Sequence, residues 1–168
     1  SVILNITPDH IERHKSFKNY TEAKFSLLNS QTKKSVAFVK GNDPVIKKKL
    51  RKKMYKQKII KIDTSNIPAL FKKISNKYFL SFGNRENLIF VLKICQFLKI
   101  NRKKIIKIIN KFKGLKYRQQ IVFNNNNLTI INDSKSTSLA SSENLLKNLK
   151  SVYWIVCGIP KKSDKFNL

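Results

Sequence analysis

A row of polar side chains directly follows an apolar run near the middle of the second half of the chain. Residues 128–131 are apolar except for Thr129, and the next six residues are Asn132, Asp133, Ser134, Lys135, Ser136 and Thr137. Open α/β sheets bind ligands at the carboxyl ends of their strands, so this order predicts a site at a strand end. Asp, Ser and Thr also cap helices, and a helix is expected from about Thr137. Taken alone, the segment fits capping as well as catalysis.

A second motif precedes this segment and gives it a context. Gly114-Leu115 and Arg118 lead into a strand at 121–123, an Asn-rich turn at 124–127 and the strand at 128–131. This order, ending in Asp-Ser-Lys-Ser-Thr at 133–137, resembles the start of the carboxy-terminal domain of the Mur ligases. Sister branches of that family follow the Asp with Tyr- or Asn-rich signatures, so the chain is most similar to the branch that adds D-glutamate. The resemblance implies a ligase of peptidoglycan synthesis.

The first residues of the chain carry another part of the resemblance. Leu4-Asn5, Asp9-His10 and Arg13 are similar to the family's Leu-Asn-x-x-x-Asp-His-x-x-Arg stretch, and Lys24 stands in a matching Ala-Lys pair. The resemblance implies that His10 helps to hold a magnesium ion and that Lys24 becomes a carbamate, an anionic oxygen ligand. A buried lysine near a metal can lose its proton and react in this way.

The same residues allow plainer interpretations. Without the resemblance, Lys24 is one more lysine on an amphipathic helix. His10 and His14 are spaced i,i+4, which suits zinc, but no third ligand pattern accompanies them, and surface histidines beside a capped helix are the alternative.

The resemblance also implies roles in nucleotide and substrate binding. The family's Gly-x-His-Asn-x-x-Asn motif is matched at Asn84 and Asn87, with Gly83 in place of the His, so Asn87 is expected to contact adenine; alternatively Asn84 is only a helix cap. Arg118 would reach the nucleotide phosphates, and Asp133 would bind the ribose or hold Arg118. The expected ligands of the D-glutamate carboxylates are Lys135, Ser136, Thr137 and Lys161. The segment 157–161 departs from the family's Gly-Gly-Asp-Gly-Lys pattern and keeps only its Lys.

Alternating strands and helices predict an α/β fold. Strands are expected at 2–6, 35–39 and 59–62, with a further apolar run at 78–82; Thr7 and Pro8 should start a short helix, and longer helices are expected at 20–28, 44–54, 84–100 and 101–112. After Gly114 the expected order is strand, turn, strand, a helix at 139–149 and a strand at 152–156, the start of a βαβ unit. By resemblance, residues 1–113 are the later part of a central ATP-binding domain and residues 114–168 begin a Rossmann-like carboxy-terminal domain.

Composition bounds the remaining possibilities. The net charge is +27 and the pI about 10.3, which favours a nucleic-acid partner. Only five of the 36 basic residues are Arg, however, and the lysines fall on the polar sides of expected helices, so a solvated surface is the preferred interpretation and a small nucleic-acid-binding protein the rival. Cys95 and Cys157 have apolar neighbours and are expected to be buried thiols in a reducing compartment. No apolar run has the length of a membrane span, so a monomeric cytoplasmic protein is expected.

The limits of the chain suggest a part of a larger enzyme. It begins at Ser1 inside an apolar run, ends at Leu168, and contains no Gly-x-x-Gly-Lys-[Ser/Thr] phosphate loop. We therefore expect an internal fragment that is inactive alone. In the complete enzyme the resemblance implies ATP and Mg²⁺ as cofactors, and UDP-N-acetylmuramoyl-L-alanine and D-glutamate as substrates joined through an acyl phosphate. Another Mur ligase or a folylpolyglutamate-type ligase is the alternative within the superfamily.

Overall fold

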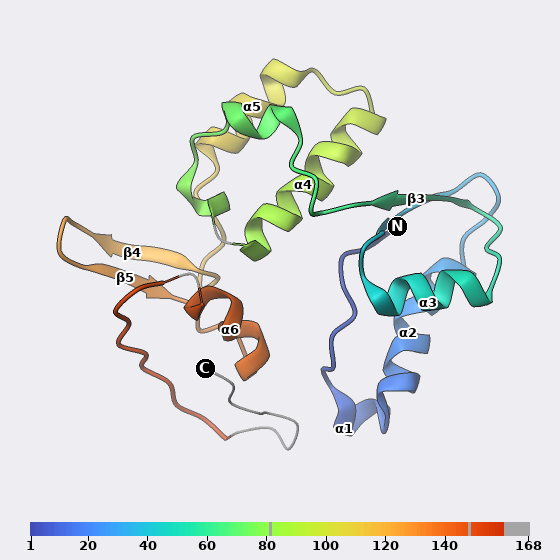
Figure 1. The fold of residues 1–168 in the computed structure, drawn as a ribbon, viewed down its shortest axis with the longest axis horizontal. Helices are drawn as coiled ribbons and strands as arrows, with labels where there is room; N and C mark the ends of the chain where they lie inside the picture. The colour runs from blue at the N-terminus through green and yellow to red at the C-terminus, as the bar shows by residue number, and fades with distance from the viewer. Residues whose placement is uncertain (81, 148, 160–168) are drawn as a thin grey trace. The chain divides into compact units, whose positions relative to one another are not determined.

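Three parallel strands form the centre of the amino-terminal part of the protein. They are β1 (Val2–Ile3), β2 (Val36–Lys40) and β3 (Lys58–Ile62), in the order β1-β2-β3 (Figure 1). The structure is a computed structural model that describes residues 1–80, 82–147 and 149–159. Helices follow the strands along the chain, so the predicted α/β class is confirmed.

Helices cover both faces of this sheet because β2 is apolar on both sides. Ala37 and Val39 point to one face and pack in a core with α2 (Phe17–Asn29) and α3 (Pro44–Lys52). Phe38 points to the other face and packs with Ile89 and Phe90 of α4 (Phe82–Phe97). A strand buried on both faces is typical of parallel sheets, in which helical connections cover each side.

Capping residues fix where three of the helices begin. Ser16 caps α2, Asp43 caps α3 ahead of Pro44, and Asn101 caps α5 (Arg102–Lys111); in each case a side-chain oxygen accepts a hydrogen bond from a backbone N–H of the first turn. The starts at Pro44 and near Asn101 agree with the sequence. The start of α2 lies three residues before the predicted Tyr20.

The chain divides into two compact units, each described here by itself. The sheet unit contains Ser1–Phe71 and Ile89–Ile100, and the hairpin unit contains the described residues of Lys72–Leu88 and Asn101–Leu168. The hairpin unit holds α5, the antiparallel hairpin of β4 (Gln120–Asn124) and β5 (Thr129–Asn132), and α6 (Leu139–Leu146). Two 3₁₀ turns, at Ala69–Lys73 and Lys77–Leu80, precede α4. None of the helices in the described residues is long and apolar enough to span a bilayer.

Two predictions about the first residues were wrong. The first strand covers only Val2–Ile3, because its pairing with β2 reaches no further than Val39. Thr7 does not begin a helix. The short helix α1 (Ile11–His14) starts later, and His10, at its cap position, has a left-handed backbone and no side-chain cap.

The apolar run that starts at Tyr78 lies partly in the 3₁₀ turn Lys77–Leu80, where Tyr78 packs edge-on and Phe79 stacks against Phe112. Two further predictions were wrong. Residues 152–156 have no partner strand in the described chain and remain irregular, so the βαβ unit is not formed there. Cys157 is exposed rather than buried, and Cys95 is half-buried.

Candidate functional site

The end of β5 is organised around the Asp133 carboxylate. Its Oδ1 accepts a hydrogen bond from the Gln119 backbone N–H at 3.0 Å, and its Oδ2 accepts one from the Ser136 hydroxyl at 2.7 Å. The Lys135 N–H donates to the Tyr117 carbonyl at 3.0 Å. These bonds join the segment before β4 to the segment after β5, so the two motifs that the sequence singled out lie together.

Asn84 extends this network to helix α4. Its side-chain amide donates to the Tyr78 carbonyl and to Gln119 Oε1, both at 3.0 Å. Asn84 lies within α4, which begins at Phe82, so the alternative that it is an N-cap was wrong. Asn87, one helical turn later, is exposed. Around Gly83 an added Cβ would meet nothing within 4 Å, so the place of the family's histidine opens on free space.

Tyr78 packs against the segment that leads from α5 to the hairpin. Gly114 has a φ of +78°, and a Cβ there would lie 2.8 Å from Tyr78 Cε2, so only glycine fits. Burial raises the pKa of the Tyr78 phenol, while a hydrogen bond with the Leu115 backbone and the charge of Arg118 lower it, and Asp133 raises it. Arg118 is itself exposed. Its guanidinium therefore acts on the Tyr78 phenol while keeping access to solvent.

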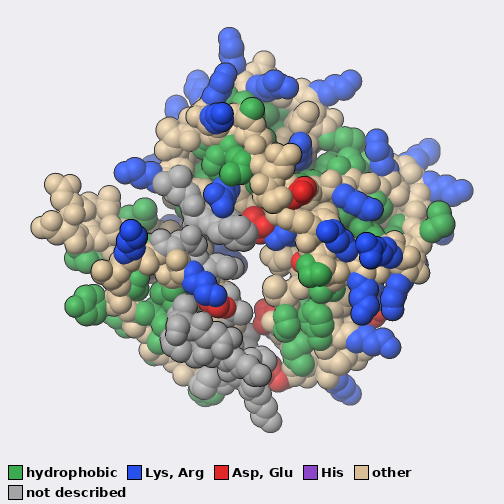
Figure 2. Space-filling model, in the orientation of Figure 1, with side chains coloured by type: hydrophobic (Ala, Val, Ile, Leu, Met, Phe, Trp, Pro, Cys, Tyr) green, Lys and Arg blue, Asp and Glu red, His purple; other side chains and the backbone are tan. Residues whose placement is uncertain are grey.

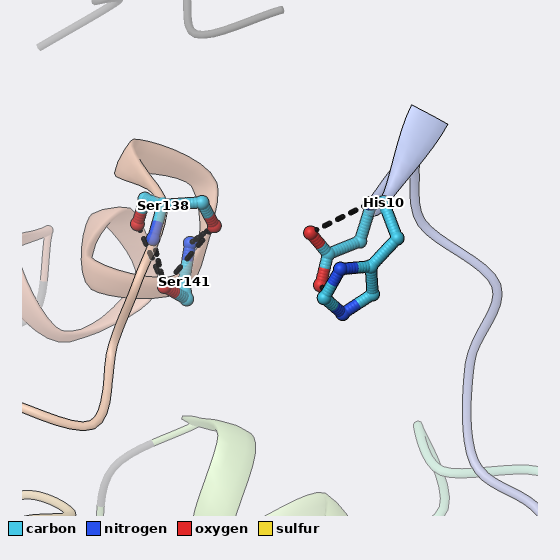
Figure 3. A network of polar contacts seen from close by, with 4 residues as sticks. His10, Ser138 and Ser141 are labelled. Carbon is cyan, nitrogen blue, oxygen red and sulfur yellow. Dashed lines mark hydrogen bonds and ion pairs between the residues drawn. The ribbon is translucent and has the colours of Figure 1, made fainter. Parts of the chain in front are cut away.

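The residues after Asp133 are not needed to cap the following helix. Ser138 caps α6: its hydroxyl accepts from the Ser141 N–H at 3.3 Å, and the Ser141 hydroxyl accepts from the Ser138 N–H at 3.2 Å (Figure 3). The interpretation of the segment up to Thr137 as the cap of this helix was therefore wrong. Lys135 and Thr137 are exposed, whereas the hydroxyl of Ser136 is engaged by Asp133.

In the sheet unit, His10 is held by its neighbour Asp9. The His10 N–H donates to Asp9 Oδ1 at 2.9 Å, and His10 Nε2 lies 3.4 Å from Asp9 Oδ2 (Figure 3). His10 precedes α1, whereas His14 is its last residue and packs edge-on against Tyr20. The pair therefore does not share a helical face, as the zinc alternative requires. The described residues contain no group of three His, Cys, Asp or Glu side chains that could hold a metal ion.

Lys24 lies on α2 beside the ring of Tyr20. Its Nζ is 5.3 Å from the ring centroid, and its side chain is exposed rather than buried as the carbamate argument assumed. The side chain therefore lacks the burial on which the carbamate argument depends.

Sequence reasoning missed two residues that organise these regions. Gln119 joins Asn84 to Asp133, with its own backbone at a φ of 47°, and Tyr20 is buried between His14, Phe17 and Lys24. For Gln119 the only indication in the sequence was its position directly after Arg118. For Tyr20 the only indication was the apolar pattern of its helix. Lys161, the remaining predicted substrate ligand, lies outside the described residues.

Comparison with protein families gives the class of this chain. Residues 1–100 match the family model described as the Mur ligase middle domain. The chain belongs to the Mur ligase family.

Curated relatives narrow the comparison to one branch of that family. The chain is 34% identical to the UDP-N-acetylmuramoylalanine–D-glutamate ligase of Buchnera aphidicola subsp. Schizaphis graminum, over 100% of this chain and 41% of that protein. It is 30% identical to the protein of the same name from Rickettsia felis, over 96% and 40%, and 32% identical to that of the Wolbachia symbiont of Brugia malayi, over 96% and 35%. The chain thus spans about two fifths of the length of these relatives.

Proposed function

We propose that this chain is the nucleotide- and amino-acid-binding part of an ATP-dependent ligase that joins D-glutamate to UDP-N-acetylmuramoyl-L-alanine. Family membership supports the ligase class, and the names of the relatives support the substrates. The observation that carries the proposal is the Asp133 network, because it brings Asn84, Arg118 and the 135–137 segment into one unit while leaving Lys135 and Thr137 exposed. In this reaction ATP phosphorylates the alanyl carboxylate, the D-glutamate amine attacks the acyl phosphate, and phosphate leaves.

The hairpin unit offers donors of the kinds that these ligands require. Arg118 is exposed and forked, which suits bidentate binding of phosphate oxygens. The exposed amide of Asn87 can pair with the edge of an adenine ring. The Lys135 ammonium and the Thr137 hydroxyl can donate to the carboxylates of D-glutamate, with Lys161 as a further donor. Ser136, by contrast, acts through Asp133, since its hydroxyl already donates there.

The sheet unit supplies two side chains for the magnesium ion that we include in this proposal. Magnesium is usually held by one or two carboxylates together with substrate phosphates, so His10 and a Lys24 carbamate need not form a complete protein cage. When bound, the ion would offset negative charge on the phosphoryl group. The support for a Lys24 carbamate is the Ala23-Lys24 match to the family, since the side chain is exposed in the structure. In the complete enzyme, Lys24→Ala should abolish turnover, and added short-chain carboxylates should restore part of the activity. Full activity of the Lys24→Ala enzyme without added carboxylates would show that Lys24 has no role in the site.

A chimeric enzyme tests the proposed activity. The matched segment of the Buchnera relative is replaced by this chain, and phosphate release is measured with ATP, UDP-N-acetylmuramoyl-L-alanine and different amino acids. We expect release that depends on D-glutamate and not on L-glutamate or a dibasic amino acid. A folded chimera that prefers another amino acid would assign the chain to a sister ligase.

We propose in addition that the complete enzyme acts as a monomer in the cytoplasm. Light scattering can check the oligomeric state, and cell fractionation can check the location.

A further inference from the structure

A small cavity of about 190 Å³ lies beside the carboxyl ends of β2 and β3 in the sheet unit. It is lined by Gly41, Lys47, Leu50, Arg51 and Lys61. Three of these five residues are cationic, and none of the five belongs to the residues that we propose for the ligase reaction. Ligands of α/β sheets bind at this edge of the strands.

Two elements bring the three cations to the cavity. Lys47 and Arg51 are four residues apart on α3, and side chains with this spacing lie on one face of a helix. Lys61 is next to last in β3 and shares its face with Ile59, which packs against the core that α2 and α3 cover. On this face of β3, the apolar residue Ile59 is thus followed by the cationic residue Lys61 at the end of the strand.

Gly41 shapes the floor of the cavity without offering a donor to a ligand. Its N–H already donates to the Ile62 carbonyl at 2.6 Å. A Cβ at this position would lie 3.1 Å from Lys61 Cβ, which is tighter than an ordinary contact. The glycine therefore lets the end of β2 approach β3, and any ligand contacts must come from side chains.

The charges around the cavity are poorly balanced. Among the described residues no carboxylate lies within ion-pair distance of Lys47, Arg51 or Lys61, whereas Lys49, on the same helix, pairs with Glu22. Asp63 is a carboxylate that Lys47 influences: its pKa is lowered mainly by hydrogen bonds from Ser65 and to a smaller degree by the charge of Lys47. The Asp43 carboxylate, at the start of α3, accepts a hydrogen bond from the Ile46 N–H. Figure 2 shows Lys and Arg side chains gathered over the region of α3 and β3.

We propose that this cavity binds a compact phosphate-bearing anion of the size of pyrophosphate. Three cations with one Arg suit phosphate oxygens, because a guanidinium binds two of them at once and an ammonium adds a point charge. Sites for drug-sized ligands measure about 300–1,000 Å³, so this smaller cavity fits a phosphate group or pair rather than a whole nucleotide. The inference rests on the sheet unit and does not require the ligase function.

Calorimetric titration of the 168-residue chain with inorganic pyrophosphate at physiological salt tests the site. We expect saturable binding of one pyrophosphate per chain, weakened about tenfold or more by Arg51→Gln and abolished by combining K47Q, R51Q and K61Q. The matched control combines K48Q, K52Q and K58Q, which removes the same charge from exposed positions of the same helix and strand. This control should leave affinity within about twofold, since neighbouring residues of a helix project in different directions and Lys58 points to the other face of β3 from Lys61.

Gly41→Ala is a variant that changes the cavity and not the charge. We expect it to weaken pyrophosphate binding severalfold while far-UV circular dichroism shows a retained fold. If the two triple variants lost pyrophosphate affinity equally, or if Gly41→Ala still bound pyrophosphate tightly, the binding would come from diffuse surface charge and not from this cavity. If pyrophosphate did not bind saturably, the proposal would be wrong. If the cavity substitutions then weakened binding to duplex DNA or to anionic lipid vesicles, the ligand of these cations would be a macromolecule or a membrane instead.

Discussion

The sheet unit and the β4–β5 hairpin use apolar residues in opposite ways. In the sheet unit β2 places Ala37 and Val39 on one face and Phe38 on the other, all at most 6% exposed, because helices cover both sides. The hairpin strands also carry apolar residues in succession, yet Ile121 and Phe123 remain nearly half exposed. An apolar strand therefore indicates a buried strand only when helices of the same unit cover it. Stability should lie in the sheet unit, and the exposed hairpin can serve to position groups at its ends.

The largest predicted difference is between two phenylalanines. Phe25 is 1% exposed in the core of the sheet unit, so Phe25→Ala should cost about 3–5 kcal/mol of unfolding free energy. Phe123 is 46% exposed, and Phe123→Ala should cost about 1 kcal/mol or less. Urea unfolding of the whole chain, followed by circular dichroism, measures both. Equal losses would show that the hairpin is packed as tightly as the sheet, against the comparison above.

A second contrast separates two glycines of the hairpin unit. Gly114→Ala should cost about 1–3 kcal/mol for its positive φ, and more because the added methyl meets the Tyr78 ring. Gly83→Ala should stabilise the protein by about 0.5–1 kcal/mol, since the position is helical and open. Thermal unfolding of both variants gives the comparison. A harmless Gly114→Ala would mean that Tyr78 does not hold the start of the hairpin segment.

A smaller effect distinguishes capping from ligand binding around α6. Ser138→Ala should cost about 1 kcal/mol, because it removes the capping box, whereas Thr137→Ala should leave stability unchanged. The same unfolding measurements decide the matter. If Thr137→Ala were the more damaging change, the helix would begin one residue earlier and Thr137 would be a cap rather than a substrate donor.

The elements that could be predicted from the sequence are those whose signals are local. The β2 run and the starts of α3 at Pro44 and of α5 near Asn101 each depend on residues adjacent in the chain, and each is confirmed. The failures concern distant partners. Residues 152–156 look like a strand but have none to pair with among the described residues, and nothing local could show that Tyr78 and Phe79 pack on Phe112, more than thirty residues away.

The candidate site followed the same rule. Asp133 and Arg118 were found because their motifs are short and ordered. Gln119 was missed because its role arises only when α4 and the end of β5 come together. The exposure of Lys24 agrees with the plainer interpretation of a lysine on an amphipathic helix, whereas its contact with the Tyr20 ring could not be predicted. The substrate roles themselves stay predictions.

The central claim is that the hairpin unit divides its work, with Lys135 and Thr137 on the amino acid and Asn87 and Arg118 on the nucleotide. The most direct test is steady-state kinetics of the chimeric enzyme carrying Lys135→Ala or Asn87→Ala. Loss of one charge-assisted contact should change affinity by about tenfold to a hundredfold. Lys135→Ala should therefore raise the KM for D-glutamate and leave that for ATP nearly unchanged, with the reverse for Asn87→Ala. If Lys135→Ala instead weakened ATP and left the dependence on D-glutamate intact, the assignment of the segment after β5 would be wrong.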